Sequence, residues 1–558
     1  MRLDHLWVGE YKNLRDVLID FDQDHWVTVV IGWNGTGKSN VLEALATLFR
    51  DLIIIADNKS AANKKPSFTY CILYRCRCNS IYIDADPKRV KDAYKIYVKP
   101  INDSEQATNY VQRSLLEDAP EDPTNDWGKR IPLSQFIAAQ EQYLPKYIFG
   151  YYSGHSSRME EVFRKYLADY DKDLRSGKDP GLRRLFYALP IHSQFVLLAF
   201  IIQQDNIVCD FLNEQLGLDP ESGIDSVLFV LRQPPWNSKV GDSRFWNARG
   251  VVSHFLARLY DVSLAPIRIK RRVDASLWNK KSREFLYLYV QDMKALRKLV
   301  GEKHPREFFR DIESTYVSEL IEEVRIRVKL RKNDGSVTFR ELSEGEQQLL
   351  TVLGLLRFTA EEESLFLLDE PDTHLNPVWS VKYLDYLKQF VGMGDINQET
   401  THVLLTTHNP LAIAELVKEQ VQILKRNMDN LEINVSPPEE DPRGMGYAGI
   451  LTSDMFDLPA SLDNYTLSLL ARKRELSLSE TPLDNTQKEE LKKLNDELES
   501  YGFRHEARDP LFTEYLRARQ DYQKALEKQR SKEVLPTEDQ RKVALELMKK
   551  IMSNNEDS

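Results

Sequence analysis

The stretch that decides the fold is Val27-Thr-Val-Val-Ile-Gly-Trp-Asn-Gly-Thr-Gly-Lys-Ser39. Its apolar beginning, residues 27–31, is typical of a buried strand, and residues 32–39 have the G-x-x-x-x-G-K-S spacing of a phosphate-binding loop. The pattern of residues 40–49 predicts an amphipathic helix directly after the loop. Glycines allow backbone N–H groups to curl around phosphates at a helix N-terminus, where the helix dipole also favours anions. This order of strand, loop and helix predicts a nucleotide-binding α/β fold.

The positions of this loop have expected contacts with a nucleotide. Lys38 should reach the β- and γ-phosphates, and the hydroxyl of Ser39 should ligate Mg²⁺. A glycine turn that only joins a strand to a helix is the structural alternative, but it does not explain the Lys-Ser pair in this context. The residues expected to bind the nucleotide are Gly32, Asn34, Gly35, Gly37, Lys38, Ser39 and Asn40.

Two further apolar strands end in residues suited to phosphate chemistry. Leu365-Phe-Leu-Leu-Asp369-Glu370 delivers two carboxylates at the end of a strand. Asp369 should join Ser39 in holding Mg²⁺, and Glu370 should polarise the attacking water, so Glu370 is a predicted catalytic residue. The strand Val403-Leu-Leu-Thr-Thr-His408 ends in the second predicted catalytic residue, a histidine that could bond the γ-phosphate and sense hydrolysis. Either strand taken alone has an ordinary structural interpretation.

The fourth motif is Glu341-Leu-Ser343-Glu-Gly345-Glu346-Gln347-Gln348, which opens an apolar-periodic helix. Ser343 and Glu346 are spaced as a capping box, which is the structural interpretation. A helix N-terminus with a free serine hydroxyl and a glycine N–H can also receive a γ-phosphate. A capping box does not explain the whole Leu-Ser-x-Gly-x-Gln string. We therefore expect nucleotide contacts from Ser343, Gly345, Glu346 and Gln347.

These motifs, in this order, resemble those of the ABC ATPase superfamily. The resemblance implies ATP and Mg²⁺ as cofactors and hydrolysis of ATP to ADP and phosphate. It also implies a head-to-head dimer, in which Ser343 of one subunit closes on the nucleotide held by Lys38 of the other. The matching segments are the Walker A loop 32–39, the signature 342–347, the Walker B strand 365–370, the D-loop 371–377 and the switch histidine His408.

The sequence departs from the superfamily pattern at two places. Glu346 stands where the signature has its second glycine, a position at which SMC-like and defence ATPases often vary. No clear glutamine follows the strand expected over 147–152, so Tyr152-Ser153 would take the place of the Q-loop.

The long segment between the Walker A loop and the signature resembles the SMC-like and overcoming-lysogenization-like ATPases, which act with nucleic acids. More narrowly, residues 185–194, 341–350, 449–456 and 501–503 resemble the PtuA ATPase family of Septu antiphage systems, which also occurs as a retron effector subunit. This resemblance implies a subunit that senses infection and controls a separately encoded, PtuB-like HNH nuclease. The implied partners are a second copy of the chain, that nuclease, and a retron reverse transcriptase with its DNA.

Two other function classes stay open: an SMC-like ATPase of DNA repair or chromosome maintenance, and an ATP-binding switch or scaffold with little turnover. The chain itself is not predicted to be a nuclease. No Asp-x-Asp pair follows His408, as a C-terminal Toprim site would need, and the histidines are scattered rather than clustered as in an HNH motif. The Asp-x-Asp pair Asp84 and Asp86 falls in an expected hairpin turn.

The composition limits the function classes further. The chain has 558 residues, 76 basic and 86 acidic side chains, a net charge of −10 and 42% hydrophobic residues. This charge excludes a broadly cationic protein that coats DNA, although it permits a local basic groove. The N-terminus lacks the apolar core of a signal peptide, and the longest apolar runs are too short to span a bilayer. We therefore expect a cytoplasmic protein without a membrane partner.

Two local clusters have competing interpretations. The densest basic stretch, residues 268–272 followed by 280–283, alternates Ile and Arg as a strand with a cationic face for phosphates would. A charge-protected strand edge is the alternative. Cys71, Cys76 and Cys78 lie close together, and a strand would point the last two to one face. The aromatic and apolar residues around them argue against a zinc site, which needs a fourth ligand and a turn between ligand pairs.

The predicted fold class is α/β: an ABC ATPase head, with a mixed sheet around the phosphate loop and an antiparallel β-lobe, a large helical insertion and a helical C-terminal extension. Residues 1–155 should form the first part of the head, 156–320 the insertion, 321–426 the second part of the head, and 427–558 an extension that could dock a partner. Hairpins are expected over 67–99 and 321–339, and an apolar stripe at Leu491, Leu494 and Leu498.

Overall fold

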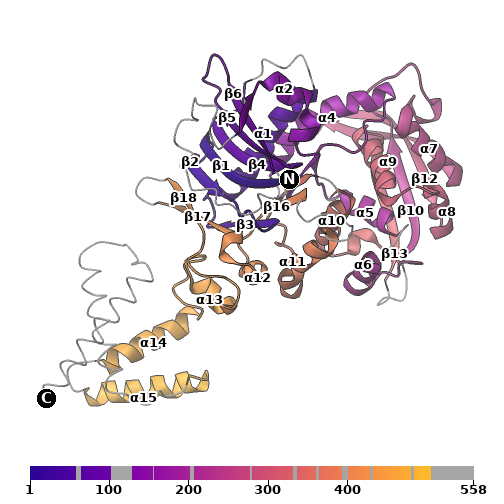
Figure 1. Ribbon diagram of the computed structural model, residues 1–558. Helices are drawn as coiled ribbons and strands as arrows, with labels where there is room; N and C mark the ends of the chain where they lie inside the picture. Colours follow the sequence, from indigo (N-terminus) through magenta and orange to yellow (C-terminus); the bar gives the residue numbers. More distant parts are fainter. Residues whose placement is uncertain are drawn as a thin grey trace. The chain divides into compact units, whose positions relative to one another are not determined.

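The computed structural model describes residues 1–57, 65–101, 128–154, 156–201, 206–276, 279–330, 336–359, 363–391, 400–427, 432–478 and 483–503. The chain forms two compact units, Met1–Asp457 and Leu458–Ser558 (Figure 1). The described residues of each unit include an apolar cluster of its own. Among the described residues, we find no helix with both the length and the apolar character needed to cross a membrane.

A seven-stranded mixed sheet lies at the centre of the first unit, in the order β18-β17-β3-β16-β15-β8-β9. Its strands pair in parallel, except that β18 is antiparallel to β17. The inner strands are almost continuously apolar because parallel strands are buried on both faces. The strands are β3 (Val27–Gly32), β8 (Tyr147–Tyr152), β9 (Leu185–Tyr187), β15 (Ser364–Asp369), β16 (Thr401–Thr406), β17 (Val421–Arg426) and β18 (Ile433–Ser436).

A six-stranded antiparallel lobe, in the order β2-β1-β4-β5-β6-β7, shares an apolar cluster with helix α1 (Lys38–Asp57) and with residues of the central sheet. The predicted α/β class, with a phosphate-loop core and an antiparallel lobe, is confirmed. The short helices α2 (Leu133–Ala138) and α3 (Gln140–Tyr143) follow this lobe. Its strands are β1 (Arg2–Tyr11), β2 (Leu14–Asp20), β4 (Tyr70–Cys76), β5 (Asn79–Ala85), β6 (Tyr94–Pro100) and β7 (Lys129–Ile131).

The segment 67–99 contains three strands where a single hairpin is expected. The turn at Asp86-Pro87 is present, but a second tight turn at Arg77 and Cys78, with φ of 45° and 57°, separates β4 from β5. No glycine or Asn-Gly pair signals that turn. It also leaves Cys76 buried and Cys78 exposed, so the expectation that both point to one face is wrong. Among the described residues, no group of three or more His, Cys, Asp or Glu side chains could hold a metal ion.

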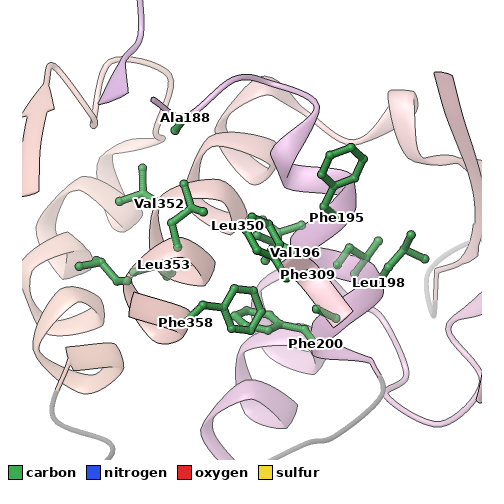
Figure 2. Close-up of a cluster of buried hydrophobic side chains, with 14 of the residues drawn as sticks. Ala188, Phe195, Val196, Leu198, Phe200, Phe309, Leu350, Val352, Leu353 and Phe358 are labelled. Atoms are coloured by element: carbon green, nitrogen blue, oxygen red, sulfur yellow. The ribbon is translucent and has the colours of Figure 1, made fainter. Parts of the chain in front are cut away.

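Helices α5 (His192–Phe200), α9 (Pro305–Val317), α10 (Glu344–Thr359) and α11 (Pro377–Val391) contribute to the other large apolar cluster. Figure 2 shows Val196 and Phe200 of α5 beside Leu350 and Phe358 of α10, and the centre of the Phe358 ring lies 5.4 Å from that of Phe200 and 5.2 Å from that of Phe309 of α9. Gly354 lets α5 and α10 approach closely, because a Cβ at that position would collide with Val196. The signature helix α10 is therefore packed directly against the inserted segment.

Residues 156–320 differ from the mostly helical segment that the sequence predicts. They contain the expected helices, but also the long strands β10 (Ile224–Arg232), β11 (Leu264–Ser276) and β12 (Asn279–Val290). These join β13 (Ile321–Lys329) and β14 (Ser336–Thr338) in an antiparallel sheet of order β11-β12-β10-β13-β14. The strand predicted at the basic stretch and the pairing of the 321–339 hairpin are confirmed, while the turn at Asn333-Asp334-Gly335 lies outside the described residues. The helices of this segment, besides α5 and α9, are α4 (Arg158–Ser176), α6 (Asn206–Asp210), α7 (Gly250–Val262) and α8 (Met293–Val300).

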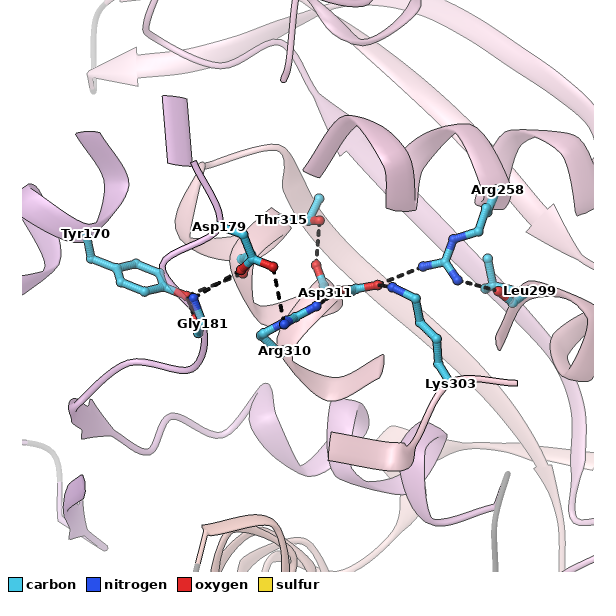
Figure 3. A network of polar contacts seen from close by, with 10 residues as sticks. Tyr170, Asp179, Gly181, Arg258, Leu299, Lys303, Arg310, Asp311 and Thr315 are labelled. Atoms are coloured by element: carbon cyan, nitrogen blue, oxygen red, sulfur yellow. Dashed lines mark hydrogen bonds and ion pairs between the residues drawn. The ribbon is translucent and has the colours of Figure 1, made fainter. Parts of the chain in front are cut away.

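Two buried ionic clusters fix helix α9 within the inserted segment. Asp311 is fully buried and accepts from Arg258 of α7 at 2.7 Å, and it also pairs with Lys303 and Arg310 (Figure 3). Glu313, also buried, pairs with Arg183 and accepts from Nε2 of His192 at 2.8 Å. The Leu189 N–H donates to Nδ1 of His192, so the ring proton is on Nε2.

The residues that follow β17 begin with a strand, β18, before the expected helices. Helices α12 (Pro410–Ile413) and α13 (Gly446–Thr452) belong to the first unit, and α14 (Asn464–Ser477) and α15 (Asn485–Ser500) to the second. In the second unit, Leu494 and Leu498 are buried and Leu491 packs beside them, which confirms the predicted stripe. The four-part division of the chain stays a prediction.

Glu313→Gln should lower the free energy of unfolding by about 3–5 kcal/mol, because it leaves the Arg183 charge buried without a counter-charge. Burial alone would raise the pKa of Glu313, but Arg183 and His192 outweigh burial and hold the pKa below its ordinary 4.5. The carboxylate therefore stabilises the fold above that value, and this contribution is lost as the pH falls through the lower folded-state pKa.

Chemical denaturation at neutral and acid pH tests this expectation, and the gap between wild type and variant should shrink in acid. Glu307→Gln, on the exposed side of the same helix, is the matched control and should change stability little. A gap that stays constant down to pH 3 would contradict the ionic role of Glu313.

Candidate nucleotide-binding site

The phosphate loop begins where β3 ends. A Cβ on Gly32 would fall 2.5 Å from the carbonyl oxygen of Leu424, so a side chain has no room there. Lys38 folds back over the loop and donates to the carbonyls of Gly32 at 2.7 Å and Trp33 at 3.5 Å. Burial lowers the pKa of Lys38, and the nearby carboxylates Glu370 and Asp369 oppose that shift.

A residue that the sequence interpretation missed supports this loop from the turn between β1 and β2. The Asn13 amide donates to the Gly35 carbonyl at 3.0 Å and accepts from the Asn40 amide. A Cβ on Gly37 would fall 3.0 Å from the Asn13 side-chain oxygen. Asn13 therefore connects the loop to the start of α1, and no motif within the loop could have revealed it.

Asp369 lies at the end of β15, beside the loop. It is buried, and its Oδ1 accepts from the Thr406 hydroxyl at 2.5 Å. Burial raises the pKa of Asp369, while hydrogen bonds from Thr406 and Ser39 oppose that shift. The adjacent Ser39 hydroxyl and Asp369 carboxylate are oxygen ligands of the kind Mg²⁺ takes up alongside phosphate oxygens, so this donor set fits the ion.

Glu370 directly follows Asp369 in a strained conformation. Its φ is 51°, which is rare for a residue with a side chain, and such strain tends to occur at functional sites. Its N–H donates to the Thr406 carbonyl at 3.0 Å, and its Oε1 lies 3.2 Å from Nδ1 of His408. Both side chains are accessible, and His408 is exposed. The two predicted catalytic residues therefore touch each other beside Asp369 and Lys38.

The end of β8 occupies the place expected for the Q-loop. Tyr152 is paired in register with Asp369, and the next residue, Ser153, donates its N–H to the Asp369 carbonyl at 3.3 Å. The Ser153 hydroxyl also lies 3.3 Å from that of Thr373 in the D-loop. A small cavity at this point is lined by Ser39, Glu43, Tyr152, Ser156, Arg158, Met159 and Asp369. The sequence interpretation did not find Ser156 or Arg158.

The signature motif forms a complete capping box at the start of α10. The Ser343 hydroxyl donates to Glu346 at 2.9 Å, and the backbone N–H groups of Ser343 and Glu346 donate to each other's side chains. The Gln347 amide donates to the Leu342 carbonyl at 2.8 Å. Within the described part of one chain, no hydrogen bond or ion pair joins Ser343 to the phosphate loop.

The D-loop holds the signature close to the Walker B strand. A Cβ on Gly345 would fall 2.5 Å from the His374 carbonyl, so glycine permits the contact between helix and loop. The Gln348 amide donates to the Pro371 carbonyl at 2.5 Å, and His374 lies 3.4 Å from Glu344. The hydroxyl of Thr407, next to His408, donates to Asp372 at 2.9 Å. The structure thus joins the signature to the carboxylates through the backbone of the D-loop.

Two family models match separate parts of the chain. Residues 1–148 match the model described as "AAA ATPase domain". Residues 246–414 match the model described as "AAA domain, putative AbiEii toxin, Type IV TA system". The first match contains Lys38 and the second contains Ser343, Asp369, Glu370 and His408. These matches support nucleotide binding and ATPase activity in general.

The chain is also similar to the Septu protein PtuA of Bacillus mycoides (strain KBAB4), with 26% identity over 200 residues. The aligned part covers 34% of this chain and 27% of that relative, so it spans about a quarter of the relative's length. Together with the family models, this match confirms the resemblance to a PtuA-like ATPase that the motifs indicate.

Two solved structures of SMC heads are loosely similar. One is an SMC head bound to the C-winged helix domain of ScpA, with 11% identity and a TM-score of 0.31, over 78% of this chain and 98% of that one. The other is an SMC head with an extended coiled coil, bound to the C-terminal domain of ScpA derived from Pyrococcus furiosus, with 12% identity and a TM-score of 0.29, over 78% and 96%. These likenesses are too weak to carry an argument about function.

Asn13→Ala should weaken ATP binding about fivefold, since one hydrogen bond that orders the loop is worth on the order of 1 kcal/mol. Titration of a fluorescent ATP analogue measures the change. Asn464→Ala, at an exposed position in the second unit, is the matched control. Unchanged affinity in Asn13→Ala would show that the loop keeps its shape without the asparagine.

Proposed function

We propose that the chain is the ATP-hydrolysing subunit of an antiphage complex of the Septu type, and that it controls a separately encoded HNH nuclease. One observation carries the proposal. Lys38, Asp369, Glu370 and His408 converge within one chain, while among the described residues no hydrogen bond or ion pair joins the capped Ser343 to any of the four. The similarity to PtuA supports the biological setting.

In this proposal, the phosphate loop 32–39 binds ATP. Lys38 is held at the loop carbonyls and can shift its ammonium group to the β- and γ-phosphates, while the backbone N–H groups at the start of α1 face the same anion. Asn34, Gly35 and Asn40 complete the cradle in this proposal. Ser39 and Asp369 would hold Mg²⁺, which when bound would neutralise charge on the phosphates.

In this proposal, hydrolysis depends on Glu370 and His408, which contact each other beside Asp369. The Glu370 carboxylate would accept a hydrogen bond from the attacking water and orient it toward the γ-phosphate. His408 fixes the Glu370 carboxylate from one side, and its other ring nitrogen is available to the γ-phosphate. The left-handed φ of Glu370 keeps its side chain at the edge of the sheet rather than in the core.

A second copy of the chain would supply the missing side of the nucleotide. Ser343, Gly345 and Gln347 stand at the N-terminus of α10, where backbone N–H groups and the helix dipole favour a γ-phosphate. Glu346 must turn away when the phosphate arrives, because its carboxylate holds the Ser343 hydroxyl. In this proposal the capping box is the resting state of the signature, and phosphate binding opens it.

Cutting is assigned to the partner. Asp84 of the Asp-x-Asp pair is held by Arg89, which donates to both carboxylate oxygens at 2.8 Å, so this carboxylate already has a structural role. A PtuB-like HNH nuclease is the proposed effector, a retron reverse transcriptase with its DNA is a further proposed partner, and the cytoplasm is the proposed compartment. The repair ATPase and the low-turnover switch remain alternative predictions.

Glu370→Gln should reduce the rate of ATP hydrolysis at least about 100-fold and trap an ATP-bound dimer, because the amide cannot orient the water as a base. Phosphate release and light scattering after gel filtration measure both effects. Glu419→Gln, at an exposed position, is the control. A variant that hydrolyses normally, or that protects cells from phage as the wild type does, would favour the low-turnover switch.

Mixing two inactive variants tests whether the site is shared between copies. Ser343→Ala and Lys38→Ala should each be inactive alone, whereas random mixing should restore about a quarter of the wild-type activity. Half of the dimers would then be mixed, each with one intact composite site. If mixing restores nothing while both variants fold and dimerise, nucleotides are not shared between subunits in this way.

A further inference from the structure

The five-stranded sheet of the inserted segment has one covered face and one open face. Helices α7, α8 and α9 share the apolar cluster of the covered face with Leu286, Leu288 and Val290 of β12 and with the inward residues of β10 and β13 (Figure 1). Side chains alternate between the two faces of a strand, so the residues between these belong to the opposite face.

The open face presents aromatic and aliphatic side chains in neighbouring strands; Val230 and Phe285 are buried on it, and its exposed apolar side chains lie mainly on the edge strand β11. Tyr287 pairs with Ile267 of β11, and Tyr289 pairs with Leu264 of β11 and with Leu228 of β10. Residues paired across strands share a face, so these side chains form one patch. Leu264 and Ile267, on the edge strand β11, are 55% and 52% exposed, and Tyr289 of the neighbouring β12 is 38% exposed.

Cations surround this patch. On β13, Arg325 pairs with Leu228, and Arg327 and Lys329 follow at alternate positions on the same face. On the other side, Arg271 and Arg283 are paired across β11 and β12, and the Arg271 guanidinium lies 5.1 Å from the centre of the Tyr287 ring. Two carboxylates offset part of this charge: Glu323 pairs with Arg325, and Asp225 with both Arg327 and Lys329.

We propose that this open face binds single-stranded DNA. The exposed ring of Tyr289, and the Arg271 guanidinium that lies over Tyr287, offer planes on which unpaired bases can stack, and flanking arginines and lysines contact the phosphates. A duplex hides its base faces and would leave the aromatic patch unused. Two copies of this face would place their arginines against each other, which disfavours self-association. The outward side chains address bases and phosphates and do not require a 2′-hydroxyl.

This site is separate from the nucleotide site, and the inference does not rest on the proposed ATPase activity. Of the basic stretch, Arg268, Lys270 and Arg272 pair with Leu286, Glu284 and Ser282 and therefore belong to the opposite face of the sheet. The strand predicted there, β11, contributes Ile267 and Arg271 to the patch, but most of the cations come from β13.

The test is fluorescence anisotropy of the full chain with a labelled thymidine oligonucleotide of about 20 nucleotides. Arg325→Glu with Arg327→Glu should weaken binding at least about tenfold and reduce the salt slope of the affinity by about 1.4, the value expected for two lost phosphate contacts on a single strand. Tyr287→Ser with Tyr289→Ser should weaken binding at least about fivefold and leave the salt slope unchanged.

The matched controls are Lys382→Glu with Lys388→Glu on the exposed side of α11, and Tyr465→Ser in the second unit; both should bind as the wild type does. ATP hydrolysis should be unchanged in the two test variants, which separates this result from any failure at the nucleotide site. If the tyrosine variant does not fold, the arginine variant, altered only at exposed positions, decides alone.

Several results would overturn the proposal. They are no binding of the oligonucleotide at about 50 mM salt, equal loss in the test and control variants, or duplex DNA bound as tightly as the single strand. RNA bound more than about tenfold tighter than DNA would assign the face to RNA instead. A change of oligomeric state in the test variants, with DNA binding intact, would make the face a contact between copies of the chain.

Discussion

One hydrogen bond holds the candidate site in register: the Thr406 hydroxyl donates to the buried Asp369 carboxylate across the pair β15–β16. Because these strands are parallel and paired residue for residue, their ends are fixed relative to each other. Glu370 adopts its left-handed conformation immediately afterwards, and the same threonine accepts its N–H. The carboxylates, and the lysine that faces them from the loop after β3, are thus positioned by the rigid centre of the sheet.

The sequence predicted those parts of the chain whose signal is short-range. Strands buried on both faces have continuous apolar sequences, so β3, β15 and β16 could be recognised in the sequence. The polar residues at the ends of these strands then identified the candidate site. The apolar stripe of α15 was recognisable from its helical spacing, and the pairing of β13 with β14 from the turn signal Asn333-Asp334-Gly335. The roles of Lys38, Ser343, Glu370 and His408 rest on their chemistry and stay proposals.

Other features depended on contacts that no local pattern records. The turn at Arg77 and Cys78 has no glycine, so the lobe gained a strand that the sequence did not signal. Strands β10 and β12 do contain continuous apolar runs, Val227–Leu231 and Phe285–Val290, but periodicity alone does not distinguish such runs from buried helix. Asn13 reaches Gly35 only because the β1–β2 hairpin folds over the loop.

The close contact between Gly345 and the His374 carbonyl of the D-loop has a consequence for how the two nucleotides of a dimer would be hydrolysed. The Gln348 amide donates to the carbonyl of Pro371, the residue that directly follows Glu370. The N-terminus of α10 and the Walker B residues should therefore move together. In a shared dimer, a phosphate that reorders one subunit's signature would also move that subunit's own water-orienting carboxylate. The state of one nucleotide site would then influence the rate of hydrolysis at the other.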